Sequence, residues 1–271
     1  MTDSELRAAE RVWKASPESE EAIRAALTAF ERAGEDPPWA LLAASPRWRK
    51  VLGFLGEWYA RTLGPADGSS AADLAAAEAR LGASLPSILR EWFLLAGARD
   101  DIPQLRQSWS FSDLVGLSQL KADSQGWVDL GWGHQGNGSW GVRLDEGQPQ
   151  VYAYDGFWQE EGAVDLVGDL EEFYLSFLVE EFTWNGARGG AEGVRYAVYW
   201  DLEACLTAAQ LNYSRQPVRC LYGGEGDAPR PNVFGDEETL INLNDPEPVY
   251  VLTRTPEARE RAIGVFGEPP E

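Results

Sequence analysis

The sequence predicts an α+β fold: a mostly antiparallel sheet with helices packed on one side, plus an N-terminal helical extension. Apolar residues recur at helical spacing up to about residue 97, alternate from about 127 to 155, and return to helical spacing near 169. The composition, 44% hydrophobic and 11% aromatic over 271 residues, is typical of a folded globular chain. Together these observations indicate helices, then a meander, then helices again.

The first 69 residues form the predicted helical extension. Thr2 and Glu5 have the spacing of a capping box, and Ser16 followed by Pro17 is a favourable helix start. After the break at Pro37-Pro38, a third helix is expected over residues 47–63. A Gly-Ser-rich linker then leads into the next segment.

Residues 70–185 form the predicted α+β core. Two helices come first, separated by the Leu85-Pro86 step, and strands are expected at 127–132, 139–144 and 150–155, separated by glycine-rich turns. A closing helix follows at about 169–182. The apolar side chains expected to be largely buried are Leu74, Leu81, Leu85, Leu89, Trp92, Phe173 and Phe177.

Residues 186–271 form a predicted C-terminal α/β extension of the same unit. The segment repeats a strand and helix rhythm that begins with a strand at 194–200. The remaining predicted elements are a helix at 201–211, strands at 218–222 and 248–253, and a last helix capped by Thr255.

The charge of the chain is strongly acidic and unevenly distributed. Forty-four acids and 23 bases give a formal charge of −21, and residues 71–185 alone hold 19 acids and 6 bases. Such a field repels phosphate, which argues against direct binding of nucleic acid or an anionic membrane, and it favours encounter with a basic protein. Solubility alone is the alternative explanation for the charge.

The sequence predicts a cytoplasmic protein. The N-terminus mixes acids and bases without the apolar stretch of a signal peptide, and no apolar run approaches the ~18 residues that span a bilayer. Cys205 and Cys220 are the only cysteines, and they cannot form a disulfide framework or a zinc site by themselves.

The sequence lacks the usual catalytic constellations. His134 is the only histidine, and a solvent-facing or turn-bonding role suits it better than catalysis. Residues 136–141 match G-x-G-x-x-G, but the segment that follows alternates like a strand, whereas a dinucleotide site needs a helix there. We therefore expect no catalytic residues, no cofactor and no metal. A calcium or magnesium site made only of carboxylates stays open.

Paired carboxylates keep one enzymatic alternative open. Glycosidases hold two carboxylates across a sugar, often beside aromatic residues, and this chain has 12 tryptophans. However, Glu171-Glu172 and Glu180-Glu181 are expected on the solvated face of the closing helix. A carbohydrate-active or carbohydrate-binding protein is thus an alternative function.

Aromatic residues gather among acids in the strand block. Because strands alternate faces, about half of these rings belong to the core and the others lie exposed beside carboxylates. Exposed aromatic anchors ringed by charge are typical of protein-binding hot spots. The residues predicted to bind a partner are Asp129, Trp132, Trp140, Asp155, Trp158 and Glu160.

Residues 70–185 also resemble the SUKH superfamily. Residues 71–97, AADLAAAEARLGASLPSILREWFLLAG, are similar to its opening: a helix ending in Leu-Gly, a Leu-Pro step, and a helix with an aromatic and a final glycine. Residues 136–145, GNGSWGVRLD, resemble its glycine turn and strand, and DLEEFYLSFLVEEF (169–182) resembles its closing helix. Ala96-Gly97 departs from the Asn-Gly that the family often has.

The resemblance implies a binding protein. Bacterial members of the superfamily are typically immunity proteins that neutralise toxins, often nucleases, and eukaryotic relatives resemble scaffolds that regulate cell-wall assembly. The hypothesis is therefore a cytoplasmic immunity protein, without enzymatic activity, that binds a basic toxin domain. A scaffold without a toxin partner is the alternative within the same class, and the oligomeric state is left open.

Overall fold

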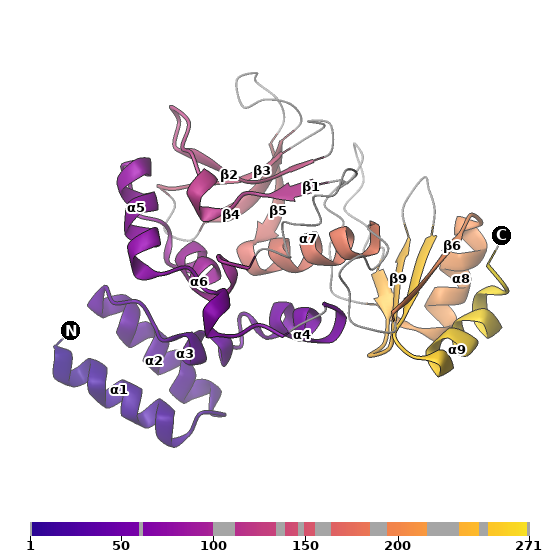
Figure 1. Ribbon diagram of the computed structural model, residues 1–271, viewed down its shortest axis with the longest axis horizontal. Helices are drawn as coiled ribbons and strands as arrows, with labels where there is room; N and C mark the ends of the chain where they lie inside the picture. The colour runs from indigo at the N-terminus through magenta and orange to yellow at the C-terminus, as the bar shows by residue number, and fades with distance from the viewer. Residues whose placement is uncertain are drawn as a thin grey trace.

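The protein has an α+β fold built around two antiparallel sheets. The structure is a computed structural model that describes residues 2–59, 62–99, 112–133, 139–145, 149–154, 164–184, 194–215, 233–243 and 249–269. The N-terminal helices lie at one end, the first sheet lies above a long helix, and the second sheet lies at the opposite end (Figure 1). No helix in these ranges is long and apolar enough to cross a membrane.

Four helices form the N-terminal part: α1 (Asp3–Ala15), α2 (Glu20–Ala33), α3 (Trp39–Ala43) and α4 (Arg49–Trp58). The capping box of Thr2 and Glu5 is confirmed. The expected cap of α2 is wrong, because Ser16 ends α1 and the Ser19 side chain accepts from the Ala22 N–H. The predicted helix 47–63 is shorter, since the backbone turns extended at Tyr59, and α3 was not expected.

The N-terminal helices divide between two cores. Helices α1 to α3 enclose a small cluster that includes Leu6, Ile23 and Phe30, all buried. Helix α4 instead packs into the main core, where Trp48 and Phe54 join side chains of the first sheet and α7. Packing therefore places α4 with the α+β core, although it precedes the predicted boundary at residue 69.

Two helices and a meander form the next part. Ser70 caps α5 (Ala71–Leu81) with a full capping box, and the left-handed Gly82 ends it. Helix α6 (Ser87–Ala96) follows, and two short 3₁₀ turns are Pro65–Asp67 and Leu117–Gln119. The first sheet has the order β1 (Ser112–Leu114), β2 (Trp127–Gly133), β3 (Ser139–Arg143), β4 (Gln150–Tyr154) and β5 (Val164–Asp169), every pairing antiparallel.

Helix α7 (Leu170–Trp184) lies between the two sheets and contacts α4, β4 and β10. Residues 173–180 are all buried, so the expected solvated acidic face holds only in part: Glu172 is exposed, whereas Glu171 is half-buried and Glu180 is buried. Most of the apolar core residues expected from the sequence are buried, and Leu81 is half-buried.

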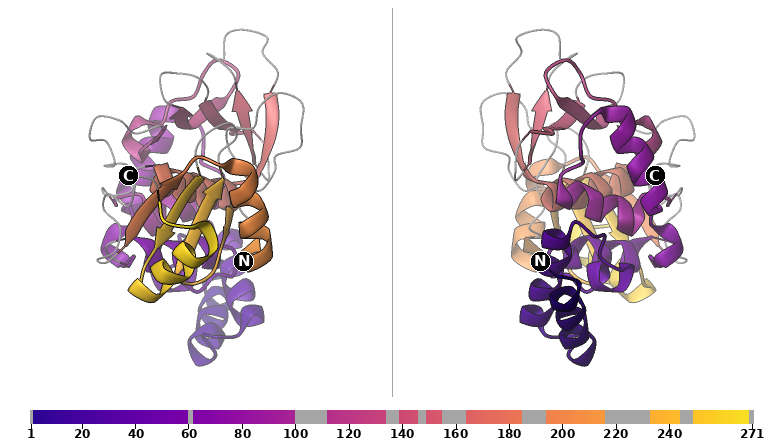
Figure 2. Two further views of the ribbon diagram at one scale, coloured as in Figure 1. Left: turned by 90° about the vertical axis from the view of Figure 1, so that its right-hand side faces the viewer. Right: turned by 90° about the vertical axis from the view of Figure 1, so that its left-hand side faces the viewer.

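The C-terminal part forms a second sheet of its own. The order is β6 (Arg195–Tyr199), β10 (Val249–Thr253), β9 (Thr239–Leu243), β8 (Val233–Gly235) and β7 (Ser214–Arg215), all antiparallel. Helices α8 (Leu202–Asn212) and α9 (Pro256–Phe266) cover its outer side (Figure 2). Its other face joins the main core through Leu240, Tyr250 and Leu252. The strand predicted at 218–222 lies outside the described residues.

Candidate functional site: the outer face of the first sheet

The first sheet packs one face on α7, and the described side chains that stand out on its other face are half-buried or exposed. Val128, Val142 and Val151 point to the covered side and are buried. Side chains of the opposite parity point away from α7. Those we group as the outer-face strip are Trp127, Asp129, Trp132, Arg143, Tyr152 and Leu166. Each member of this strip is half-buried or exposed.

A β-bulge places Trp132 and Asp129 on the same face. The register between β2 and β3 shifts between Asp129 and Gly131, so two residues three apart both face outward. The Trp132 indole N–H donates to the Asp129 carboxylate over 3.1 Å, while 41% of the residue stays exposed. The hydrogen bond holds an accessible aromatic ring in one orientation beside a carboxylate.

The rest of the strip forms an aromatic and apolar continuation. Trp127 and Tyr152 meet edge to face with ring centroids 5.3 Å apart, and the Arg143 guanidinium lies 5.9 Å from the Trp127 ring. Arg143 also donates to Asp145 at 2.7 Å. Leu166, which pairs with Tyr152 across β4 and β5, is 57% exposed. The strip therefore presents aromatic rings and an apolar side chain, and contacts with neighbouring side chains hold the Trp127 and Tyr152 rings in place.

The structure brings together two of the six residues predicted to bind a partner. Asp129 and Trp132 lie side by side on the outer face. Trp140 has the opposite parity: it is 2% exposed and packs against Phe173 and Phe177, so it is a core residue and its assignment as a surface anchor is wrong. Asp155, Trp158 and Glu160 lie outside the described residues and stay predictions.

Sequence reasoning missed four members of the strip as site residues. Trp127, Arg143, Tyr152 and Leu166 join Asp129 and Trp132 once the parity of the strands is known. The sequence did contain a signal for them. Val128 and Leu130 are apolar and alternate with Trp127 and Asp129, so they mark the face of β2 that is covered. Placing the neighbouring β3 in register would then have assigned Trp140 to the core.

The remaining sequence motifs yield no catalytic arrangement in the part of the chain that the structure describes. His134 lies outside it, and the segment after the glycine motif is strand β3, as predicted, where a dinucleotide site would need a helix. No cluster of three or more histidine, cysteine, aspartate or glutamate side chains suitable for a metal occurs among the described residues. Burial raises the pKa of the Cys205 thiol, which disfavours a reactive thiolate.

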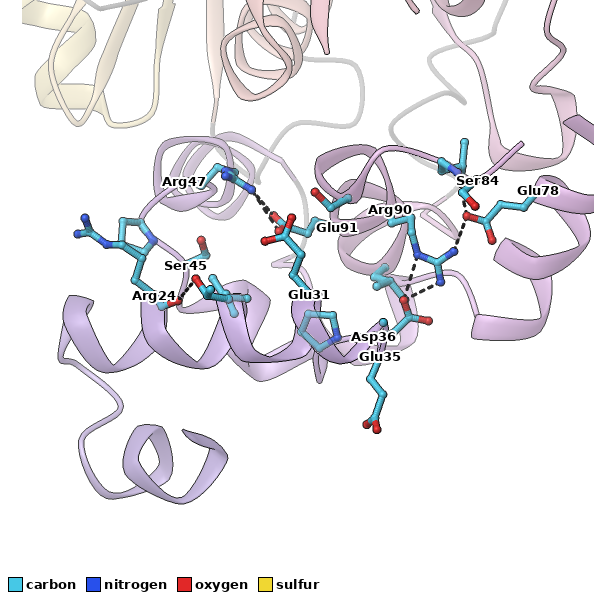
Figure 3. Close-up of a pocket in the computed structure, with 18 residues that line it drawn as sticks. Arg24, Glu31, Glu35, Asp36, Ser45, Arg47, Glu78, Ser84, Arg90 and Glu91 are labelled. Carbon is cyan, nitrogen blue, oxygen red and sulfur yellow. Dashed lines mark hydrogen bonds and ion pairs between the residues drawn. The ribbon is translucent and has the colours of Figure 1, made fainter. Parts of the chain in front are cut away.

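A buried charged group lies elsewhere, beside a cavity between α2 and α6 (Figure 3). Glu91 is buried; both of its carboxylate oxygens accept from the Arg47 Nη1 atom at 3.1 Å, and one of them also accepts from the Trp48 indole N–H at 2.8 Å. Burial raises the pKa of Glu91, and Arg47 opposes that rise. With its partners engaged in this way, Glu91 has the environment of a structural carboxylate.

Comparison with family models, curated proteins and solved structures gives no match to this chain.

Proposed function

We propose that this chain is a cytoplasmic protein-binding module, without enzymatic activity, that binds a basic polypeptide on the outer-face strip. The observation that carries the proposal is Trp132, an exposed ring that donates a hydrogen bond to Asp129 on the same face of the sheet as Trp127 and Tyr152. Protein-binding hot spots combine such pre-oriented aromatic anchors with neighbouring charge. Because Trp132 is already oriented, little side-chain entropy is lost on binding.

Charge supports a basic partner. The whole chain has a formal charge of −21, and Asp129 and Asp145 add carboxylates at the strip itself. A field of this sign speeds encounter with cations and repels nucleic acid and anionic lipid. The resemblance of residues 70–185 to the SUKH superfamily supports an immunity role, in which the partner is a basic toxin domain. A scaffold without a toxin partner uses the same face.

A second candidate function follows from the same face. Trp127, Trp132 and Tyr152 are rings at half-buried or exposed positions with Asp129 beside them, and sugars bind on aromatic platforms next to carboxylates. The alternative is a carbohydrate-binding protein. It predicts binding of oligosaccharides that does not weaken with salt, whereas binding of a basic protein does.

The first test asks whether a toxin-like domain is encoded beside the gene and whether this chain protects cells from it. We expect the chain to protect and Trp132→Ala to weaken binding of that domain by about 30-fold or more, mainly through faster dissociation, as for a hot spot of ~2 kcal/mol. Trp200→Ala is the matched control, because Trp200 is 67% exposed but lies next to the second sheet. Surface-based kinetics with the purified pair measure both rates.

Two results would contradict this proposal. Equal losses for Trp132→Ala and Trp200→Ala would remove the outer-face strip as the binding surface. A neighbouring gene that encodes no toxin, together with binding to a host polypeptide, would favour the scaffold function.

Association with the partner should also depend steeply on salt. Raising the ionic strength from 0.01 to 0.1 M shortens the Debye length from ~30 to ~10 Å, so we expect the association rate to fall while the dissociation rate changes little. Stopped-flow mixing at four salt concentrations measures the slope. An association rate that is insensitive to salt would contradict electrostatic steering by the −21 chain.

A further inference from the structure

Two tryptophans of the outer-face strip lie near opposite ends of β2, and their neighbours across the sheet differ. The backbone register pairs Trp127 with Arg143 on β3. Trp132 is paired with Ser139 on β3 and with Asp113 on β1. One tryptophan therefore stands opposite a basic residue, and the other stands opposite a small residue and an acidic one.

Arg143 shows how this face of the sheet holds a guanidinium. Its Cζ atom lies 5.9 Å from the centre of the Trp127 ring. Its Nε and Nη2 atoms donate to the two carboxylate oxygens of Asp145 at 3.0 and 2.7 Å. An aromatic face and a carboxylate thus share one arginine whose side chain is 40% exposed. Cation–π attraction and a forked, charge-assisted hydrogen bond both favour this arrangement at a surface.

Trp132 has the same two components without the arginine. Its indole N–H donates to Asp129, so a carboxylate lies at the edge of the ring, and 41% of the residue is exposed. Among the described residues no cation lies over this ring. Donation to a carboxylate makes the indole ring more electron-rich, which strengthens its attraction for a cation on its face. The accessible ring is therefore the group that a cation would recognise.

An arginine suits this ring better than a lysine does. The planar guanidinium stacks flat on an indole and is more weakly hydrated than an ammonium group, so contact costs it less hydration. We infer that the partner places an arginine side chain over the Trp132 ring, in the arrangement that Arg143 has over Trp127. This inference rests on the protein-binding function proposed above and adds the side chain that the outer-face strip recognises.

The test compares two blocked peptides of equal length and charge, hexa-arginine and hexa-lysine, titrated into the full chain in low salt. Calorimetry gives the ratio of their dissociation constants, in which the general attraction of the acidic chain for cations cancels. We expect Trp132→Ala to reduce the preference for arginine about threefold, as for one cation–π contact at an exposed site. Trp200→Ala should keep the preference of the wild type, because this exposed tryptophan lies next to the second sheet.

A second measurement locates the contact. With hexa-arginine bound, we expect NMR cross-relaxation between arginine side-chain protons and the ring protons of Trp132. The spectrum of Trp132→Ala identifies these ring resonances by their loss.

The arginine assignment is overturned if Trp132→Ala and the wild type prefer arginine to the same degree. Cross-relaxation that reaches other rings but not Trp132 would also overturn it, as would a failure of hexa-arginine to bind. No toxin domain enters these experiments. The losses of toxin-domain binding in Trp132→Ala and Trp200→Ala therefore decide separately whether the outer-face strip binds a partner.

Discussion

Replacing Trp140 with alanine should lower the free energy of unfolding by about 3–5 kcal/mol, the usual cost of deleting a large buried ring. Trp140 is 2% exposed and lies 6.1 Å from the Phe173 ring and 6.0 Å from the Phe177 ring. The cavity left behind would open between the first sheet and α7, where neither element can close it without breaking its own hydrogen bonds. Urea denaturation followed by fluorescence and circular dichroism measures the loss.

Trp132→Ala is the matched control for stability. Trp132 lies on the adjacent strand and is paired with Ser139, but its ring faces outward. We expect its removal to cost less than about 1 kcal/mol, since surface substitutions change stability little. The two tryptophans thus have opposite expected effects: Trp140→Ala lowers stability, and Trp132→Ala lowers partner binding. Similar losses of stability for both variants would mean that the faces of the sheet are misassigned.

These two tryptophans also show what a sequence pattern can establish. Alternation predicted β2, β3 and β4 within one residue at their ends, because one face of the sheet is covered and the other accessible. Alternation alone does not show which of the two sets of alternating side chains faces the core. The bulge at Asp129 and Gly131 complicates the assignment, since it changes parity within β2.

The second sheet was predicted only in part: β6 and β10 were expected at 194–200 and 248–253, whereas β9 was not expected. All five residues of β9, Thr239–Leu243, are buried because α7 and the helices α8 and α9 cover both faces of that sheet. A strand covered on both faces has no alternating pattern to detect. The burial of Glu180 has the same origin: the second sheet covers the side of α7 that would otherwise be solvated.

The Arg47–Glu91 pair shows the limit of sequence reasoning at the candidate sites. The two residues are 44 positions apart and join the segment before α4 to α6, so no local spacing links them. Trp48 donates to the same carboxylate, and its ring packs at a tilt against Trp92 with the ring centroids 5.8 Å apart. The Glu91 carboxylate is thereby buried where the N-terminal helices meet the main core. Only the assembled fold brings Arg47, Trp48 and Glu91 together.

Removing the arginine of this pair should therefore destabilise the protein in a pH-dependent way. Arg47→Ala leaves the buried Glu91 carboxylate with the Trp48 indole N–H as its remaining hydrogen-bond donor among the described residues. Removing one partner of a fully buried pair costs about 3–5 kcal/mol. Because the Arg47 side chain is 42% exposed, we expect about 2 kcal/mol at pH 7.5. Arg47 also opposes the rise that burial causes in the pKa of Glu171, so a second carboxylate loses its counter-charge.

The sign of the pH dependence follows from the raised pKa of Glu91. Burial raises this pKa in the folded protein above its unfolded value, so the folded state holds the proton more tightly. The stability that protonation contributes is fully present below the unfolded pKa and is lost as the pH rises through the folded pKa. Without Arg47 the folded pKa rises further, which moves the loss to higher pH. The deficit of Arg47→Ala relative to the wild type should thus shrink as the pH falls from 7.5 toward 4.5.

The double variant Arg47→Ala, Glu91→Gln isolates the responsible carboxylate. Glutamine keeps the size of the side chain and an oxygen for the Trp48 N–H, and it cannot titrate. We expect the double variant to recover much of the stability that Arg47→Ala loses at pH 7.5, and the difference between the two variants to disappear near pH 4.5. Urea midpoints at pH 4.5, 6 and 7.5 measure this difference, and comparing variants cancels the titration of the other carboxylates. A deficit that is equal at all three pH values would show that Arg47 stabilises the junction by packing and not by its charge.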